Sequence, residues 1–178
     1  GLTATPYRKD GLEEILFQQC GPVRHEILST DEGRLEKTVT IVETGYRPPS
    51  DVGQNPAYHV LIHHLVNDTE RNHRIARDVV NALAVKQFPL LISDRKEHLD
   101  ALTKAVETSA KAEESLAQLT VVRLDGDLPL KGRRLALERI RDLKDQGVPL
   151  LLVATASLVG EGFDLPELDT LVLATPLS

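Results

Sequence analysis

The chain has 178 residues, a formal net charge of −6 and 41% hydrophobic residues, which fits a folded domain and argues against intrinsic disorder. Its one cysteine, Cys20, excludes an intramolecular disulfide framework and a cysteine-based zinc site, and this favours a cytoplasmic protein. No apolar run approaches the roughly 18–20 residues that span a bilayer, so we expect no membrane partner. The mild acidity argues against a generally basic nucleic-acid-binding surface, but not against a local phosphate-binding face.

The first 20 residues are expected to begin in the middle of a structural unit. Residues 1–6 are typical of a strand end or a turn that Pro6 stops, and the apolar spacing predicts a helix over 11–20. The chain also lacks methionine, so we expect it to be a piece of a longer protein.

The next segment has a different pattern. Partly alternating, β-branched sequences predict strands at 22–28 and 38–44, separated by a turn at 31–33, which would form a small antiparallel β-hairpin. Residues 48–56 are rich in proline and other turn residues and are predicted to be a linker.

From residue 57 onward, strands and helices alternate. Continuous apolar strands separated by amphipathic helices predict an α/β fold with a mostly parallel sheet covered on both faces. The predicted helices are 57–66, 69–86, 95–114 and 130–145, and the predicted strands are 90–92, 120–124, 150–154 and 170–174.

Ligands of an open parallel sheet bind beyond the carboxyl ends of its strands, so the residues after each strand are the candidates for function. After the first strand, a helix N-terminus with Arg95 and Lys96 suits a phosphate, although capping of that helix by Ser93 or Asp94 explains the same residues.

The second strand is followed by a turn and the one dense basic stretch of the chain. Gly126 indicates a left-handed turn or a close backbone approach. The basic residues that follow, Arg134 among them, are nearly cancelled by acidic neighbours, so a solvated helix face is the alternative.

The third strand leads into the most informative loop. Gly160 and Gly162 would let the backbone approach a ligand, Thr155 offers a hydroxyl and Asp164 a carboxylate. By contrast, His59 and His63 share a helix face but have no further metal ligand at a recognisable spacing, so we expect a surface or packing role and no metal site.

Four segments, in this order, resemble the motifs of superfamily 2 DEAD/DEAH-box-type helicases, most closely the restriction-enzyme type (type III restriction subunit-like). Residues 1–6 resemble motif III, 90–102 motif IV, 124–141 the motif that follows it, and 152–172 motif V. The P-loop, the DEAD/DEAH box and motif VI of the family are absent.

The resemblance implies a RecA-like, P-loop-NTPase-type three-layer fold, truncated, with the hairpin as an N-terminal extension. Residues 1–20 would be the end of a first RecA-like lobe, 21–56 the hairpin and linker, and 57–178 a second lobe that is incomplete at its carboxyl terminus. The missing first lobe would then be a partner.

By the same resemblance, the second lobe would bind the phosphate backbone of a nucleic acid, DNA rather than RNA. The residues implied in this contact are Ser93, Arg95, Gly126, Arg134 and Thr155. The full-length protein would be an ATP-dependent helicase.

The nucleotide site implied by the resemblance is only partly in this chain. Gly160, Gly162 and Asp164 would face the cleft between the lobes, where ATP and Mg²⁺ bind, and Thr3 and Thr5 would couple hydrolysis to strand movement. The Mg²⁺ ligands would lie outside the chain, so we expect the isolated fragment to be inactive as an ATPase.

Two other functions fit the residues without the resemblance. One is a non-enzymatic α/β interaction module that docks through residues 22–44. The other is an α/β enzyme that binds a nucleotide or another small molecule through the 155–164 loop.

Overall fold

The computed structural model describes residues 11–25, 37–49, 56–124, 130–156 and 165–176. The helices are α1 (Glu13–Cys20), α2 (Tyr58–Val66), α3 (Thr69–Ala84), α4 (Lys96–Ala110) and α5 (Leu130–Asp145), with a short 3-10 helix η2 (Glu114–Leu116). The strands are β1 (Pro89–Ile92), β2 (Thr120–Leu124), β3 (Leu150–Ala154) and β4 (Thr170–Leu173). No described helix is long and apolar enough to cross a membrane.

The chain divides into two units, residues 1–42 and residues 43–178. The smaller unit contains α1, a helix without a buried residue, on which Ile15 and Leu16 are exposed. The larger unit contains every described strand and the other described helices.

The four strands form one parallel sheet in the order β2-β3-β1-β4. Leu90 of β1 is in register with Leu152 of β3 on one side and with Leu171 of β4 on the other. The central strands β1 and β3 are buried along their whole length, as expected for apolar strands covered on both faces. The predicted α/β fold with a parallel sheet is therefore confirmed.

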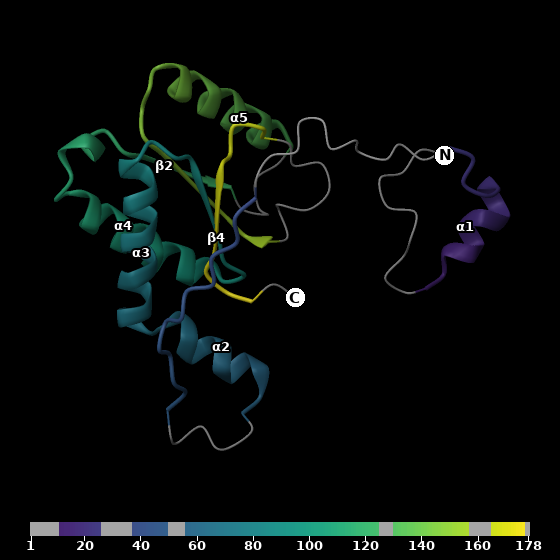
Figure 1. Cartoon of the computed structure of the whole chain (residues 1–178), viewed down its shortest axis with the longest axis horizontal. Coiled ribbons are helices and arrows are strands. Elements are labelled where there is room, and N and C mark those ends of the chain that lie inside the picture. Colours follow the sequence, from purple (N-terminus) through teal and green to yellow (C-terminus); the bar gives the residue numbers. More distant parts are fainter. Residues whose placement is uncertain (1–10, 26–36, 50–55, 125–129, 157–164, 177–178) are drawn as a thin grey trace. The chain divides into compact units, whose positions relative to one another are not determined.

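Helices α3 and α4 cover one face of this sheet (Figure 1). Leu91 and Val153 point to this face and pack with Val79 of α3 and with Leu99 and Leu102 of α4. These helical residues recur at spacings of three or four, which places them on one side of each helix. The layer forms because each helix has one apolar stripe to bury.

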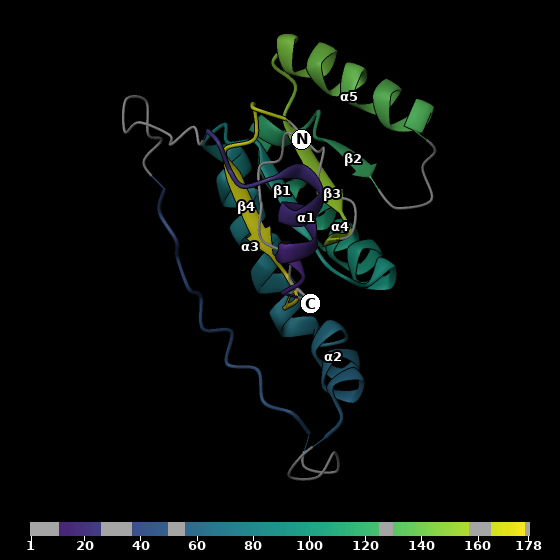
Figure 2. The same cartoon turned by 90° about the vertical axis from the view of Figure 1, so that its right-hand side faces the viewer.

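Helix α5 covers the opposite face over β2 and β3 (Figure 2). Alternate strand residues such as Leu90 and Leu152 pack here with Ile140 of α5 and with Leu165. Because successive side chains of a strand point to opposite faces, one sheet supports both cores and the larger unit has three layers.

The predicted β-hairpin is wrong in its described part. Residues 21–25 and 37–49 contain no strand, and the turn predicted at 31–33 lies outside the described residues. Val39 and Ile41 are 86% and 89% exposed, so neither of these apolar side chains is buried. Alternation predicts a strand only where one face is buried. The interaction module stays an alternative.

Candidate functional site

Hydroxyl side chains lie within two residues of the ends of three neighbouring strands, at the carboxyl edge of the sheet. Ser93 follows β1, Thr155 follows β3 and Thr175 lies two residues after β4, and their exposed fractions are 0%, 7% and 3%. The Ser93 amide donates to the Ala154 carbonyl at 3.3 Å, so the pairing of β1 with β3 continues one residue past the strands. We call Ser93, Thr155 and Thr175 the hydroxyl edge.

The position of this edge in the topology is the one where ligands of parallel sheets bind. The connection that leaves β1 runs through α4 on one face, whereas the connection from β2 to β3 runs through α5 on the other. The carboxyl ends of β1 and β3 lie next to each other in the sheet, so Ser93 and Thr155 lie together at the edge where ligands of parallel sheets bind.

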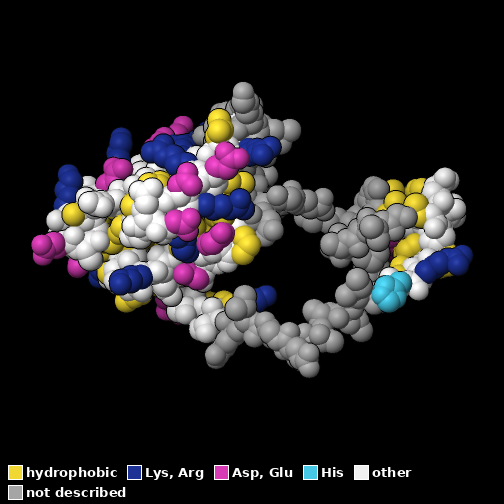
Figure 3. Space-filling model, turned by 90° about the horizontal axis from the view of Figure 1, so that it is seen from above, with side chains coloured by type: hydrophobic (Ala, Val, Ile, Leu, Met, Phe, Trp, Pro, Cys, Tyr) yellow, Lys and Arg dark blue, Asp and Glu magenta, His cyan; other side chains and the backbone are white. Residues whose placement is uncertain are grey.

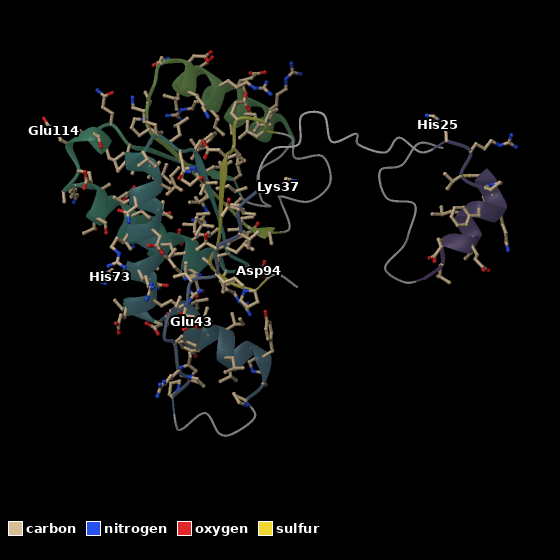
Figure 4. All side chains as sticks on the ribbon, viewed as in Figure 1. His25, Lys37, Glu43, His73, Asp94 and Glu114 are labelled. Carbon is tan, nitrogen blue, oxygen red and sulfur yellow. The ribbon has the colours of Figure 1, made fainter. Side chains whose placement is uncertain are left out.

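Thr175 holds the loop that follows β1. Its hydroxyl oxygen accepts a hydrogen bond from the Asp94 amide at 3.0 Å, and Figure 4 shows Asp94 beside the carboxyl end of β4. Thr175 is not among the site residues predicted from the sequence. The signal that identifies it is a polar residue within two residues of the end of a parallel strand, and the same signal identifies Ser93 and Thr155.

Ser93 is engaged inside the protein. Its Oγ lies 2.9 Å from Nδ1 of His98 and accepts the Arg95 amide at 3.2 Å. The N-cap of α4 is Arg95 and makes no side-chain capping bond, so neither Ser93 nor Asp94 caps the helix as the alternative interpretation expected.

Two buried polar residues that sequence reasoning missed extend this network. Nε2 of His98 lies 2.8 Å from Oδ1 of Asn72, and Nδ2 of Asn72 donates to the Val66 carbonyl at 2.9 Å. The signal was present in the helical spacing, because His98 lies four residues before Leu102 and so shares its apolar stripe. A polar residue in an apolar stripe indicates a buried hydrogen-bonded group.

His98 is held in its neutral form. Its exposed fraction is 1%, and burial, followed by the positive charge of Arg71, lowers its pKa from 6.5 to about 4. At neutral pH the ring therefore has one N–H donor and one acceptor nitrogen.

Arg71, in the first turn of α3, contacts the residue that follows β4. Its Nη2 donates to the Ala174 carbonyl at 2.6 Å, and its amide donates to the Asp68 carboxylate that caps the helix. Burial lowers the pKa of Arg71, and the negative charge of Asp68 offsets part of this effect. The exposed fraction of the residue is 9%, so this guanidinium joins the helix to the end of β4 and is not a surface charge.

The structure brings only some of the predicted site residues together. Arg95 is exposed at the start of α4, next to the hydroxyl edge. Arg134 is exposed on α5 and pairs with Glu138 of the same helix at 3.1 Å, the arrangement of a solvated helix face. The other predicted site residues lie outside the described residues: Thr3, Thr5, Gly126, Gly160, Gly162 and Asp164.

The surface charge of the larger unit is mixed. Figure 3 shows Lys and Arg side chains interspersed with Asp and Glu on the visible face. Within the described residues, no group of three or more His, Cys, Asp or Glu is arranged to hold a metal ion. His59 and His63 are exposed on α2.

The fold and the position of the site define a class of protein. A parallel sheet with helices on both faces and polar loops at its carboxyl edge is a three-layer α/β fold, and it is consistent with a RecA-like domain. No protein-family model matches the chain, and a search of curated proteins finds no match.

Among solved structures, the chain is similar in fold to T4 UvsW, with a TM-score of 0.51 and 17% sequence identity. The similarity covers 68% of this chain and 22% of that chain, so this chain spans about a fifth of the length of that protein. The likeness supports a distant helicase-like fold.

Proposed function

We propose that the chain is the carboxyl-terminal motor lobe of an ATP-dependent nucleic-acid helicase or translocase. The observation that carries the proposal is the hydroxyl edge at the carboxyl ends of the strands of a helicase-like fold, with Arg95 exposed beside it. The motif resemblance of residues 90–102 and 152–172 falls on the loops that follow β1 and β3.

The chemistry of this edge suits a phosphate backbone. Phosphate contacts position a strand without reading its bases, and they are made by hydroxyls, backbone amides and a few basic side chains. We assign the contact to Thr155 and Arg95, with Ser93 shaping the loop between them, and we propose that Gly126 and Arg134 extend it. DNA is the proposed partner in preference to RNA.

The nucleotide would bind where this lobe meets another. We propose that Gly160, Gly162 and Asp164 face ATP and its Mg²⁺ across the cleft, and that Thr3 and Thr5 belong to the first lobe and couple hydrolysis to movement. Phosphoryl transfer needs a P-loop and Mg²⁺ ligands, and the sequence contains no P-loop motif. The isolated chain is therefore proposed to be inactive as an ATPase, and the whole protein to act in the cytoplasm.

Binding of a labelled single-stranded oligonucleotide, followed by fluorescence anisotropy, tests the proposal. With a net charge of −6 the chain should bind weakly and lose affinity as salt is added. The variant Arg95→Ala should bind about threefold to tenfold more weakly, because it removes one phosphate contact.

Lys111→Ala is the matched control, because Lys111 is exposed at the other end of the same helix. This variant should bind as the unmodified chain does. Equal affinity of the Arg95→Ala variant and the Lys111→Ala control, or no binding by the unmodified chain at low salt, would contradict the proposal.

A further inference from the structure

We propose that His98 and Asn72 are positioning residues: they hold the loop at residues 93–95 to the corner between α2 and α3. The inference rests on the proposed function only in the role it gives to that loop, since the loop would present Arg95 to a nucleic acid. The claim about the loop itself is structural and can be tested separately.

The hydrogen bonds of this network can be satisfied in one direction only. Nδ2 of Asn72 donates to the Val66 carbonyl, so Oδ1 of Asn72 is an acceptor. Nε2 of His98, 2.8 Å away, must then be the donor, which fixes the tautomer of the neutral ring.

This tautomer also fixes the direction of the hydrogen bonds between His98, Ser93 and the Arg95 amide. Nδ1 of His98 is left as an acceptor, so the Ser93 hydroxyl donates to it at 2.9 Å. The lone pairs of Ser93 Oγ then accept the Arg95 amide at 3.2 Å. Bonds therefore run without a gap from the Arg95 amide to the Val66 carbonyl.

Burial gives this network its rigidity. Exposed fractions are 0% for Ser93, 1% for His98 and 7% for Asn72, so water does not replace a lost partner without a rearrangement. Leaving one such buried group unpaired is unfavourable, because its hydrogen bonds to water have already been lost. The alternative orientations of the Ser93 hydroxyl and the His98 ring are thereby disfavoured.

The loop that results has its backbone fixed on two sides. The Asp94 amide is bonded to Thr175 and the Arg95 amide to Ser93. The exposed side chain of Arg95 thus extends from a backbone held in one place, and such preorganisation reduces the ordering cost of binding. Ser93 is accordingly assigned to hold the loop, and Arg95 to meet the ligand.

Imidazole ¹H–¹⁵N NMR spectra of the chain test the network itself. His98 should carry its proton on Nε2 and keep its shifts from about pH 8 down to about pH 5.5, where an ordinary histidine titrates. The Asn72→Asp variant should raise the pKa of His98 by about two pH units, because a carboxylate would face the ring. A proton on Nδ1, or a pKa that Asn72→Asp leaves unchanged, would overturn the inference.

Amide hydrogen exchange tests the effect on the loop. The His98→Phe variant should speed exchange at Asp94 and Arg95 about tenfold relative to Leu151 and Leu152 of β3, which report global stability. Val106 lies in the same helix and is equally buried, so Val106→Ala is the control. It should change the exchange rates at Asp94 and Arg95 by the same factor as those at Leu151 and Leu152. If His98→Phe does not fold, Asn72→Ala gives the same comparison.

The outcomes separate this inference from the proposed function. One result in the His98→Phe and Asn72→Ala variants is that the exchange rates at Asp94 and Arg95 change by the same factor as those of the β3 amides. That result would overturn the positioning role, whatever the chain binds. Selective acceleration there supports the positioning role. If the unmodified chain also fails to bind an oligonucleotide, then the proposed function fails and the positioning role remains.

Discussion

Nη2 of Arg71 donates a 2.6 Å hydrogen bond to the carbonyl oxygen of Ala174, a residue 103 positions later in the chain. The bond joins the first turn of α3 to the end of the edge strand β4. The other neighbour of that strand end is β1, through the bond from the Ala174 amide to the Ile92 carbonyl at 2.8 Å. Ala174 therefore depends on both contacts for its position at the carboxyl edge.

Replacing Arg71 by methionine should lower the free energy of unfolding by about 1–3 kcal/mol, because the variant removes a donor from a buried carbonyl. Urea unfolding followed by circular dichroism measures this change. The control Arg77→Met, at an exposed position of the same helix, should change it by less than about 0.5 kcal/mol. Equal losses in the two variants would show that the bond to Ala174 contributes nothing.

The stability of the protein should depend on pH through His98. Its pKa is about 4 in the folded chain and 6.5 in the unfolded chain, so the unfolded state binds the extra proton first as the pH falls. The contribution of neutral His98 is complete above about pH 6.5 and is lost progressively between about pH 6.5 and pH 4.

The His98→Gln variant provides the comparison, because glutamine does not titrate. Urea unfolding of both proteins at about pH 7 and about pH 4.5 should show the steeper loss for the unmodified chain, by up to a few kcal/mol. The same loss in both proteins would mean that His98 titrates normally in the folded state.

The face of the sheet under α4 should be sensitive to loss of volume. Leu102 is fully buried between α3, α4 and the sheet, and Leu102→Ala should cost about 2–5 kcal/mol of stability. Leu135 is 57% exposed on α5, and Leu135→Ala should cost less than about 0.5 kcal/mol. Thermal unfolding of the two variants measures the difference, and a Leu102 variant as stable as the Leu135 variant would contradict the packing described.

At the amino edge of the sheet, Lys144 fixes the end of α5. Its Nζ lies 4.7 Å from the centroid of the Phe88 ring and donates to the Glu167 carbonyl at 2.9 Å. Lys144→Met should destabilise the protein by about 0.5–2 kcal/mol. Unfolding in urea measures this change. If the variant is as stable as the unmodified chain, the ammonium group of Lys144 contributes nothing to stability beyond the packing of its aliphatic stem.

The sheet could be predicted from the sequence because its strands are short apolar runs, and the central strands β1 and β3 are buried on both faces. The predicted strands 120–124 and 150–154 have the same bounds as β2 and β3. The hairpin could not be predicted in the same way, because alternation like that of residues 38–44 says nothing about whether a partner surface exists.

The candidate site was predictable only in part. Ser93 and Thr155 were identified because they follow strands, a purely local signal. The bonds of His98 to Asn72 and of Arg71 to Ala174 join residues 26 and 103 positions apart. Their partners depend on how the helices pack, which no local pattern contains, although the polar positions in apolar stripes indicate that such partners exist.

The most direct test of the central claim is to follow the backbone amides of the ¹⁵N-labelled chain by NMR while a single-stranded DNA oligonucleotide is added at low salt. The account predicts shift changes at the carboxyl edge, at Arg95, Lys96 and Thr155, and none at Thr120 and Thr170, where strands begin at the amino edge. Changes confined to the amino edge, or no changes at all, would contradict the assignment of this edge to a nucleic-acid backbone.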